Sequence, residues 1–229
     1  MHQYKYLKPE HAEGLMHNGA IRIGTLYEYR ESEDERADKL EGSRQYKMSG
    51  SRVDTANETS EAQYLRMQGF NNCVFENSHP NGAIAITERV SKDCYIYCTS
   101  KKFDENNLNK FGGACIRIDR PNEFFSMVGL SLRQQGYVLG DFEVAEIIYC
   151  ARDKVYNYSE DVPQDIPGWQ VKPSIFSPEQ EIRTMWHGAK ETDLKPALVQ
   201  SEFITYRTLE PIFLSVPELC NSNGFTRIA

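Results

Sequence analysis

The sequence lacks the features of several large protein classes. No apolar run approaches the roughly 20 residues that a membrane-spanning helix needs, and the polar opening MHQYKYLKPE lacks the apolar core of a secretory signal. Six cysteines form no C-x-x-C pair, and five dispersed histidines show no H-E-x-x-H spacing. We therefore expect a cytoplasmic protein with reduced thiols, no membrane association and no metal site.

Common nucleotide-binding and hydrolase signatures are missing as well. The chain contains neither G-x-G-x-x-G nor G-x-x-x-x-G-K-[ST], so a Rossmann unit and a P-loop have no motif support. It also contains no G-x-S-x-G, and a cysteine nucleophile would need a nearby histidine that no sequence spacing indicates. The chemistry that remains to be considered is that of carboxylates.

Composition is typical of a globular domain and its charge limits the choice of partner. Of 229 residues, 40% are hydrophobic and 26% are charged, which is not the balance of a disordered chain. The formal charge of −7 disfavours tight nonspecific binding to nucleic acid through a broad basic surface. A local basic patch stays open as an option, and its candidate residues are Lys101, Lys102, Lys110, Arg117 and Arg120.

Hydrophobic patterning predicts an α+β fold with a β-rich body and few short helices. We expect a single domain, residues 1–229, because no internal repeat or composition break divides the chain. A charged excursion at about 28–52 predicts a long loop, of the kind that often forms a lid or a binding loop. Helices are predicted at residues 9–19 and 121–136, and strands at 3–7, 20–26, 62–70, 72–78, 83–90, 94–100, 114–119, 142–150, 178–187, 197–206 and 211–216.

The stretch KPSIFSPEQEIRTMWH, residues 172–187, has the most informative pattern. In an extended strand Glu179, Glu181 and Arg183 lie on one face, whereas Ile182 and Trp186 lie on the other. The simplest interpretation is a half-buried strand whose charged face meets water. A functional interpretation requires partner residues elsewhere in the chain.

Such partners are suggested by the order of motifs along the chain. YKYL precedes a short helix and a strand that ends in GTLYEYR, and YIYCTS and EQEIR follow later. This order resembles the ADP-ribosyltransferase superfamily, in its small bacterial toxin-like or phage-defence-associated branches. The resemblance implies a split two-sheet core and NAD as co-substrate. It leaves the acceptor open between protein, RNA and DNA, and an antitoxin partner open as well.

The resemblance also implies roles for individual residues. Glu181 matches the catalytic glutamate, which stabilises an oxocarbenium-like ribose, and Glu179 matches the residue that orients the acceptor and takes its proton. Lys5 occupies a first-strand position where the family usually has arginine or histidine, and Ser100 matches a serine that supports the glutamate. Tyr27 or Tyr29 offers a surface for nicotinamide. The cofactor-binding residues implied are Lys5, Tyr27, Arg30, Thr99, Ser100 and Arg183.

Other interpretations use the same residues differently. NAD cleavage with water as the acceptor is a close variant. A noncatalytic module of the same fold, which binds a partner protein or a nucleotide, is favoured by lysine at position 5. A glycoside hydrolase fits poorly, since Glu179 and Glu181 on one strand face lie too close to flank a sugar. Cys98 is expected to be a small buried hydrophobic residue.

Overall fold

The computed structural model describes residues 2–31, 42–49, 52–67, 71–76, 83–150, 156–157, 167–190, 209–221 and 224–229. Within these ranges the chain forms a mostly antiparallel sheet with few helices, which confirms the predicted α+β class. The strand predicted at residues 197–206 lies outside the described residues.

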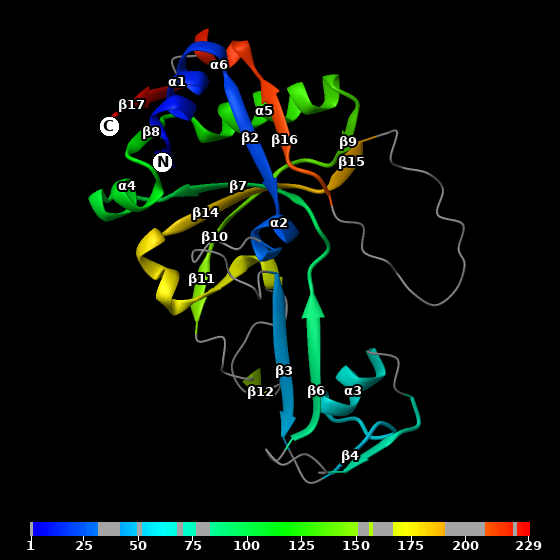
Figure 1. The fold of residues 1–229 in the computed structure, drawn as a ribbon. Helices are drawn as coiled ribbons and strands as arrows, with labels where there is room; N and C mark the ends of the chain where they lie inside the picture. Colours follow the sequence, from blue (N-terminus) through cyan, green and yellow to red (C-terminus); the bar gives the residue numbers. More distant parts are fainter. Residues whose placement is uncertain are drawn as a thin grey trace.

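An antiparallel sheet forms the body of the molecule (Figure 1). Its longest path runs, in spatial order, through β10 (Glu143–Glu146), β14 (Glu181–Trp186), β7 (Tyr95–Ser100), β1 (Gln3–Leu7), β8 (Ala114–Ile118) and β17 (Phe225–Arg227). β14 pairs with β7 along its whole length, from Glu181 opposite Ser100 to Trp186 opposite Tyr95. The sequence stretches predicted to cooperate are therefore neighbouring strands.

The sheet forks along the other edge of β7. There β7 pairs with β1 through Ser100 opposite Tyr4, and then with β2 (Ala20–Thr25) through Ile96 opposite Gly24. β2 in turn pairs with β16 (Ile212–Ser215), so one branch is β1, β8 and β17 and the other is β2 and β16. The segment of β7 between Ile96 and Ser100 faces the opening between the two branches, which we call the fork.

The main core fills the space between the sheet and α5 (Pro121–Gln134). Pro121 occupies the first turn, where its missing N–H costs nothing, and the apolar spacing i, i+4, i+8 turns Phe124, Val128 and Leu132 inward. Phe125 completes this face. Its ring centroid lies 6.0 Å from that of Trp186 on β14. The helix predicted at residues 121–136 is confirmed.

A smaller core lies on the opposite face of the same strands. Side chains alternate along a strand, so Ile96 of β7 and Met185 of β14 point away from α5. They pack with Leu26 and Tyr27 of α2 (Leu26–Glu31) and with Trp169 of η1 (Gly168–Gln170), a short 3₁₀ helix. β7 and β14 are thus covered on both faces, which explains their nearly continuous burial.

The first helix, α1 (Pro9–Asn18), forms as predicted. Pro9 begins it and Gly19 ends it in the left-handed conformation with a φ of 60°. A Cβ at Gly19 would lie 2.0 Å from the carbonyl oxygen of Val216, so this turn requires glycine. The contact fixes α1 against the segment that leads from β16 into α6 (Pro217–Asn221).

A two-stranded ribbon leads away from the body (Figure 1). It consists of β3 (Ser43–Ser49) and β6 (Ala83–Val90), which are antiparallel, and β12 (Tyr156–Asn157) adds to β3. At its far end lie β4 (Arg52–Asp54), β5 (Val74–Glu76) and α3 (Ser60–Met67), with Val53, Ala62 and Leu65 buried between them. The remaining small pair joins β9 (Tyr137–Leu139) to β15 (Gly188–Lys190).

Several sequence predictions are wrong in this part of the chain. The charged excursion contains β3 at residues 43–49 instead of being loop throughout, and α3 replaces the strand predicted at 62–70. Residues 60–67 form a helix because Ala62 and Leu65 lie on one apolar face of it. The Thr59 hydroxyl also accepts a hydrogen bond from the Ala62 N–H at the beginning of the helix. Short elements without a clear pattern escaped prediction: α4 (Glu105–Phe111), β13 (Val171–Pro173), α6 and β17.

The strand predicted at residues 142–150 is divided. β10 pairs with β14 as far as Glu146, and the Ile147 N–H then donates to the carbonyl of Glu181. The next residues form β11 (Ile148–Cys150), which turns to pair with β13 in parallel. This change of partner brings Tyr149 opposite Lys172, a contact that the site depends on.

Replacement of Phe125 by alanine tests the main core. The side chain is fully buried, so Phe125→Ala is expected to lower the free energy of unfolding by about 3–5 kcal/mol. The matched control is Phe213→Ala on β16, because Phe213 is 73% exposed and its loss should cost about 1 kcal/mol or less. Urea unfolding measures both, and equal losses would contradict this assignment of the core.

Candidate active site

Charged side chains of alternating sign form a continuous chain at one corner of the sheet. Lys110 Nζ lies 2.8 Å from Glu179 Oε1, and Lys172 Nζ lies 3.1 Å from Glu179 Oε2. The same Lys172 Nζ lies 2.6 Å from Glu181 Oε2, and Arg183 Nε lies 2.6 Å from Glu181 Oε1. Each oxygen of both carboxylates therefore accepts a hydrogen bond from a cation. We call this arrangement the charge chain.

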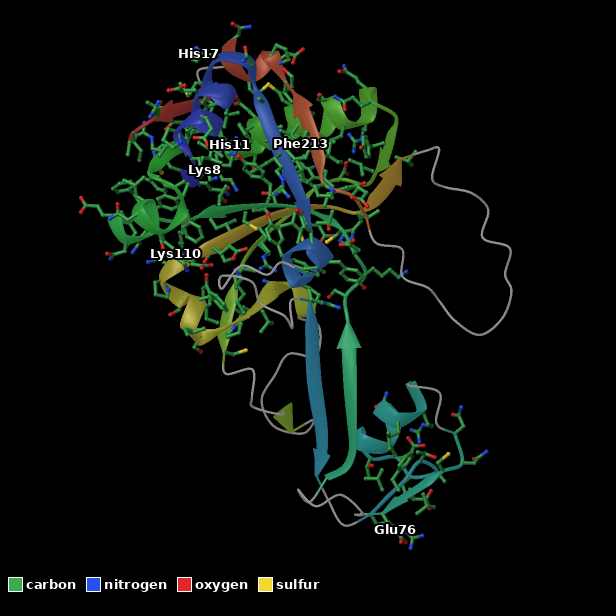
Figure 2. All side chains as sticks on the ribbon, viewed as in Figure 1. Lys8, His11, His17, Glu76, Lys110 and Phe213 are labelled. Atoms are coloured by element: carbon green, nitrogen blue, oxygen red, sulfur yellow. The ribbon has the colours of Figure 1, made fainter. Side chains whose placement is uncertain are left out.

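Four elements supply these side chains. Lys110 comes from α4, beside η2 (Ser174–Glu179) in Figure 2, and Lys172 comes from β13. Glu179 is the last residue of η2, whereas Glu181 and Arg183 begin β14. The sequence predicted one strand through Glu179, Glu181 and Arg183. This prediction is wrong at Glu179, which lies in η2 and not in a strand.

The local reason is a turn between the two glutamates. Pro178 lies inside the 3₁₀ helix, and Gln180 adopts the left-handed conformation with a φ of 44°. This turn ends the helix and starts the strand within one residue. The two carboxylates nevertheless meet, because Lys172 bridges them from a third element.

Burial makes the charge chain energetically demanding. Glu179 is 7% exposed, Glu181 5% and Arg183 1%, and a buried charge without partners is strongly destabilising. Burial by itself raises the pKa of Glu181, but the neighbouring Arg183 guanidinium and Lys172 ammonium outweigh it and hold the pKa well below its ordinary value of 4.5. Glu181 is thus a carboxylate at neutral pH.

The backbone of Glu181 is also anchored. Its N–H donates to the phenol oxygen of Tyr149 at 2.7 Å, and its carbonyl accepts the Ile147 N–H. Burial raises the pKa of Tyr149 to about 12, so the phenol remains neutral. Arg183 is fixed in turn, since its guanidinium also donates to the Trp169 carbonyl. These contacts set the position of the glutamate.

Lys5 lies in the fork. Its Nζ donates to the Cys98 carbonyl at 2.8 Å and lies 4.4 Å from the centre of the Tyr97 ring. This carbonyl is accessible to a side chain because β1 and β2 leave that edge of β7 open between them. Burial is the main cause that lowers the pKa of Lys5, and the nearby Glu181 carboxylate partly offsets it. The first-strand lysine and the glutamate therefore interact electrostatically across β7.

Ser100 and Thr99 have different surroundings although they are adjacent. Ser100 ends β7, pairs with both Tyr4 and Glu181, and is 6% exposed. Thr99 points to the other face, where its hydroxyl contacts the Gln3 side chain at 2.8 Å and the Ile182 carbonyl at 3.3 Å. The structure thus places Ser100 beside Glu181 and gives Thr99 a bracing role between neighbouring strands.

The two tyrosines of α2 are also distinguished. Tyr27 belongs to the smaller core, and its hydroxyl donates to the Ser91 carbonyl at 3.0 Å. Arg30 lies over the Tyr27 ring at 4.7 Å. Tyr29 rests against Gly24, where an added Cβ would lie 2.9 Å from its phenol oxygen, and it interacts electrostatically with Glu181. Of the two alternatives, Tyr29 is the one that lines the fork.

Cys98 is half-buried in the same place. Burial raises its thiol pKa to about 12, and the charges of Glu181, Arg183 and Lys5 act on it. It is therefore a neutral thiol at the fork, and it packs against the smaller core as a partly buried residue, whereas the sequence predicted a small buried hydrophobic one. Cys94 and Cys115 are fully buried, and all six cysteines are free.

Sequence reasoning missed Lys110, Lys172 and Tyr149. Lys110 and Glu179 are 69 positions apart, so no spacing rule connects them. Tyr149 reaches the site only because β11 leaves β14 and pairs with β13. Lys172 did lie in the stretch that the sequence singled out, but its partner acids are set by the turn at Gln180 and not by strand alternation.

No family model, curated protein or solved structure matches this chain. Among the described residues, no group of three or more histidine, cysteine, aspartate or glutamate side chains could hold a metal ion. No helix in the same part of the chain is long and apolar enough to cross a membrane. The fork and the charge chain are therefore the features of the molecule that bear on its function.

The depressed pKa of Glu181 predicts a pH-dependent stability. Its ionised form stabilises the fold fully above the ordinary value of 4.5, and this contribution is lost as the pH falls below that value toward the folded-state pKa. The free-energy difference between wild type and Glu181→Gln should therefore shrink between about pH 6 and about pH 3. Urea unfolding at several pH values measures it.

The matched control is Glu146→Gln, which removes an exposed carboxylate that pairs with Lys101 at 2.7 Å. Exposed pairs contribute little, so this variant should differ from wild type by less than about 1 kcal/mol. A Glu181→Gln difference that stays constant with pH would show that the carboxylate is not held ionised.

Proposed function

We propose that the protein is an NAD-dependent ADP-ribosyltransferase that transfers ADP-ribose to a macromolecular acceptor, nucleic acid or protein, as a toxin or an anti-phage defence effector. One observation carries the proposal. Lys5, Ser100 and Glu181 come from remote segments of the chain, yet they lie on three neighbouring strands, β1, β7 and β14, and Ser100 pairs with both Tyr4 and Glu181. The division of the sheet into two branches at β7 gives the proposal further support, because the resemblance implies a split core.

The residues present suit an NAD pocket. Lys5 supplies a cation for a phosphate or a ribose hydroxyl, and the half-buried phenol of Tyr29 supplies an aromatic face in the same fork. NAD contributes a nicotinamide–ribose bond whose breakage leaves positive charge on the ribose. Glu181, ionised and fixed by Tyr149 and Arg183, is the group that stabilises such charge.

The second carboxylate has a separate task. Glu179 lies beside Glu181 on the same bridging lysine, but it belongs to η2 and is also held by Lys110 from α4. A carboxylate in this position can take the proton of an acceptor nucleophile. Arg183 keeps Glu181 ionised, and Ser100 packs beside it in register.

A second candidate function is supported by the hydrogen bonds that the Glu181 carboxylate already accepts. Both of its oxygens already accept hydrogen bonds, from Arg183 and Lys172, as in a purely structural ion pair. In that case the protein is a noncatalytic module of the same fold that binds a partner protein or a nucleotide. The two candidates differ in whether nicotinamide is released.

Labelled NAD distinguishes the candidates. Wild-type protein incubated with cell extract and adenylate-labelled NAD is expected to transfer label to nucleic acid or protein, and Glu181→Gln should lower the rate by about 10²–10³-fold, because an electrostatic stabiliser is lost. Glu146→Gln, with an exposed carboxylate, should keep the wild-type rate. Release of nicotinamide without transfer of label would indicate water as acceptor, and no release at all would favour the noncatalytic module.

Lys5 is tested by the affinity for NAD. Loss of a hydrogen bond to a charged group costs roughly 1.5–3 kcal/mol, so Lys5→Met should raise the Kd for NAD about 10–100-fold. Lys5→Arg keeps the charge and should recover most of the affinity. Lys101→Met is the control because Lys101 pairs with Glu146 at the surface. Calorimetry measures binding, and an unchanged Kd in Lys5→Met would remove Lys5 from the pocket.

A further inference from the structure

Lys172 links the two glutamates of the charge chain, and among the described residues it is the one cation that contacts both. Its Nζ is 2.6 Å from Glu181 Oε2 and 3.1 Å from Glu179 Oε2. Within the charge chain, Lys110 contacts Glu179 and Arg183 contacts Glu181, so neither of these cations bridges the pair. The residue is 9% exposed, and the ring of Phe176 lies 5.1 Å from its Nζ.

The surroundings of Lys172 leave it little freedom. β13 holds its backbone through the parallel pairing with β11, in which Tyr149 lies opposite Lys172. The ammonium group thus projects from a fixed strand toward two acids on other elements, η2 and β14. A cation in this position holds the two carboxylates near each other. It also favours the charged form of both carboxylates over the protonated form.

We propose that Lys172 is a positioning residue that holds the carboxylates of Glu179 and Glu181 side by side and both ionised. The inference rests on the proposed transferase function, in which one carboxylate stabilises the ribose charge while the other accepts a proton. Both tasks require the unprotonated form at the same time. Without a bridging cation, two neighbouring carboxylates repel each other and one of them takes up a proton.

Among the described residues, no other group around the pair bridges Glu179 and Glu181 as Lys172 does. Burial raises the pKa of a carboxyl group, and the Tyr149 phenol and Cys98 thiol, both with a pKa raised to about 12, are neutral near pH 7. Lys5 acts on Glu181 from the far side of β7. In the part of the chain that the structure describes, the titratable and charged groups that face the pair are Lys110 of α4, Arg183 of β14, Tyr149 of β11, Cys98 of β7, Lys5 of β1 and Tyr29 of α2.

The test compares Lys172→Met with variants that change fewer contacts. Lys110→Met removes a cation from Glu179 only, and Lys101→Met removes an exposed cation that pairs with Glu146. Lys172→Arg keeps the charge, and Lys172→Gln is a second neutral variant if methionine prevents folding, which circular dichroism reports. Carbon-13 NMR of labelled glutamate carboxyl groups gives the titration of each acid, assigned with Glu179→Gln and Glu181→Gln.

The expected result is specific to the bridge. In Lys172→Met one of the two glutamates should titrate at least one pH unit higher than in wild type, and the acidic limb of the label-transfer rate should move upward by a similar amount. Lys110→Met should leave the titration of Glu181 nearly unchanged, Lys172→Arg should restore the wild-type titration, and Lys101→Met should change neither glutamate.

The carboxyl titration separates failure of this inference from failure of the proposed function. If wild type transfers no label but one glutamate still titrates at a higher pH in Lys172→Met, the positioning role of Lys172 is supported and the transferase proposal fails. If wild type transfers label and neither glutamate changes its titration in Lys172→Met or Lys172→Gln, the positioning role is refuted. If wild type transfers no label and neither glutamate changes, both proposals fail.

Discussion

The contact of Lys172 and Arg183 with Glu181 is the interaction on which the rest of this corner depends. A carboxylate with 5% exposure is tolerable only if both oxygens find cations or strong donors. That requirement ties β13 to β14 through Lys172 and Glu181, and the same Lys172 ties η2 to β13 through Glu179. The turn at Gln180 and the change of partner at Ile147 bring these elements within reach. Local backbone geometry therefore serves the pairing of buried charge.

The fork supplies the second constraint. A continuous antiparallel sheet would use the carbonyl of Cys98 in a ladder with the next strand. Because β7 passes from β1 to β2 along one edge, this carbonyl instead accepts a hydrogen bond from Lys5. The split places a cation, a phenol and a thiol near the buried carboxylate without the need for a long loop. The site thus arises from sheet topology together with burial.

Regular elements could be predicted from the sequence where a single pattern dominates. The apolar spacing in α5 and the proline and glycine of α1 each specified their structure. Prediction failed where tertiary contacts decide, as in α3, in the divided β10 and β11, and at Glu179. Residues brought together by topology, such as Lys110 and Tyr149, carry no local signal. Ser100 and Lys5 could be named only because the order of motifs along the chain resembled a known family, whereas Glu181 already stood out in the charged pattern of residues 172–187.

Burial of the charge chain has a consequence for its response to salt. Mobile ions screen charges that lie in water, with a Debye length of about 8 Å at physiological ionic strength, but they hardly reach pairs inside a protein. Lys101 and Glu146, both partly exposed, belong to the first kind, whereas Lys172 and Glu181 belong to the second. The formal charge of the protein is −7, and salt weakens the interactions between charges on its surface. The buried charges around Glu181 are hardly affected by the same change in ionic strength. Dilute buffer and concentrated salt therefore leave the geometry around Glu181 the same.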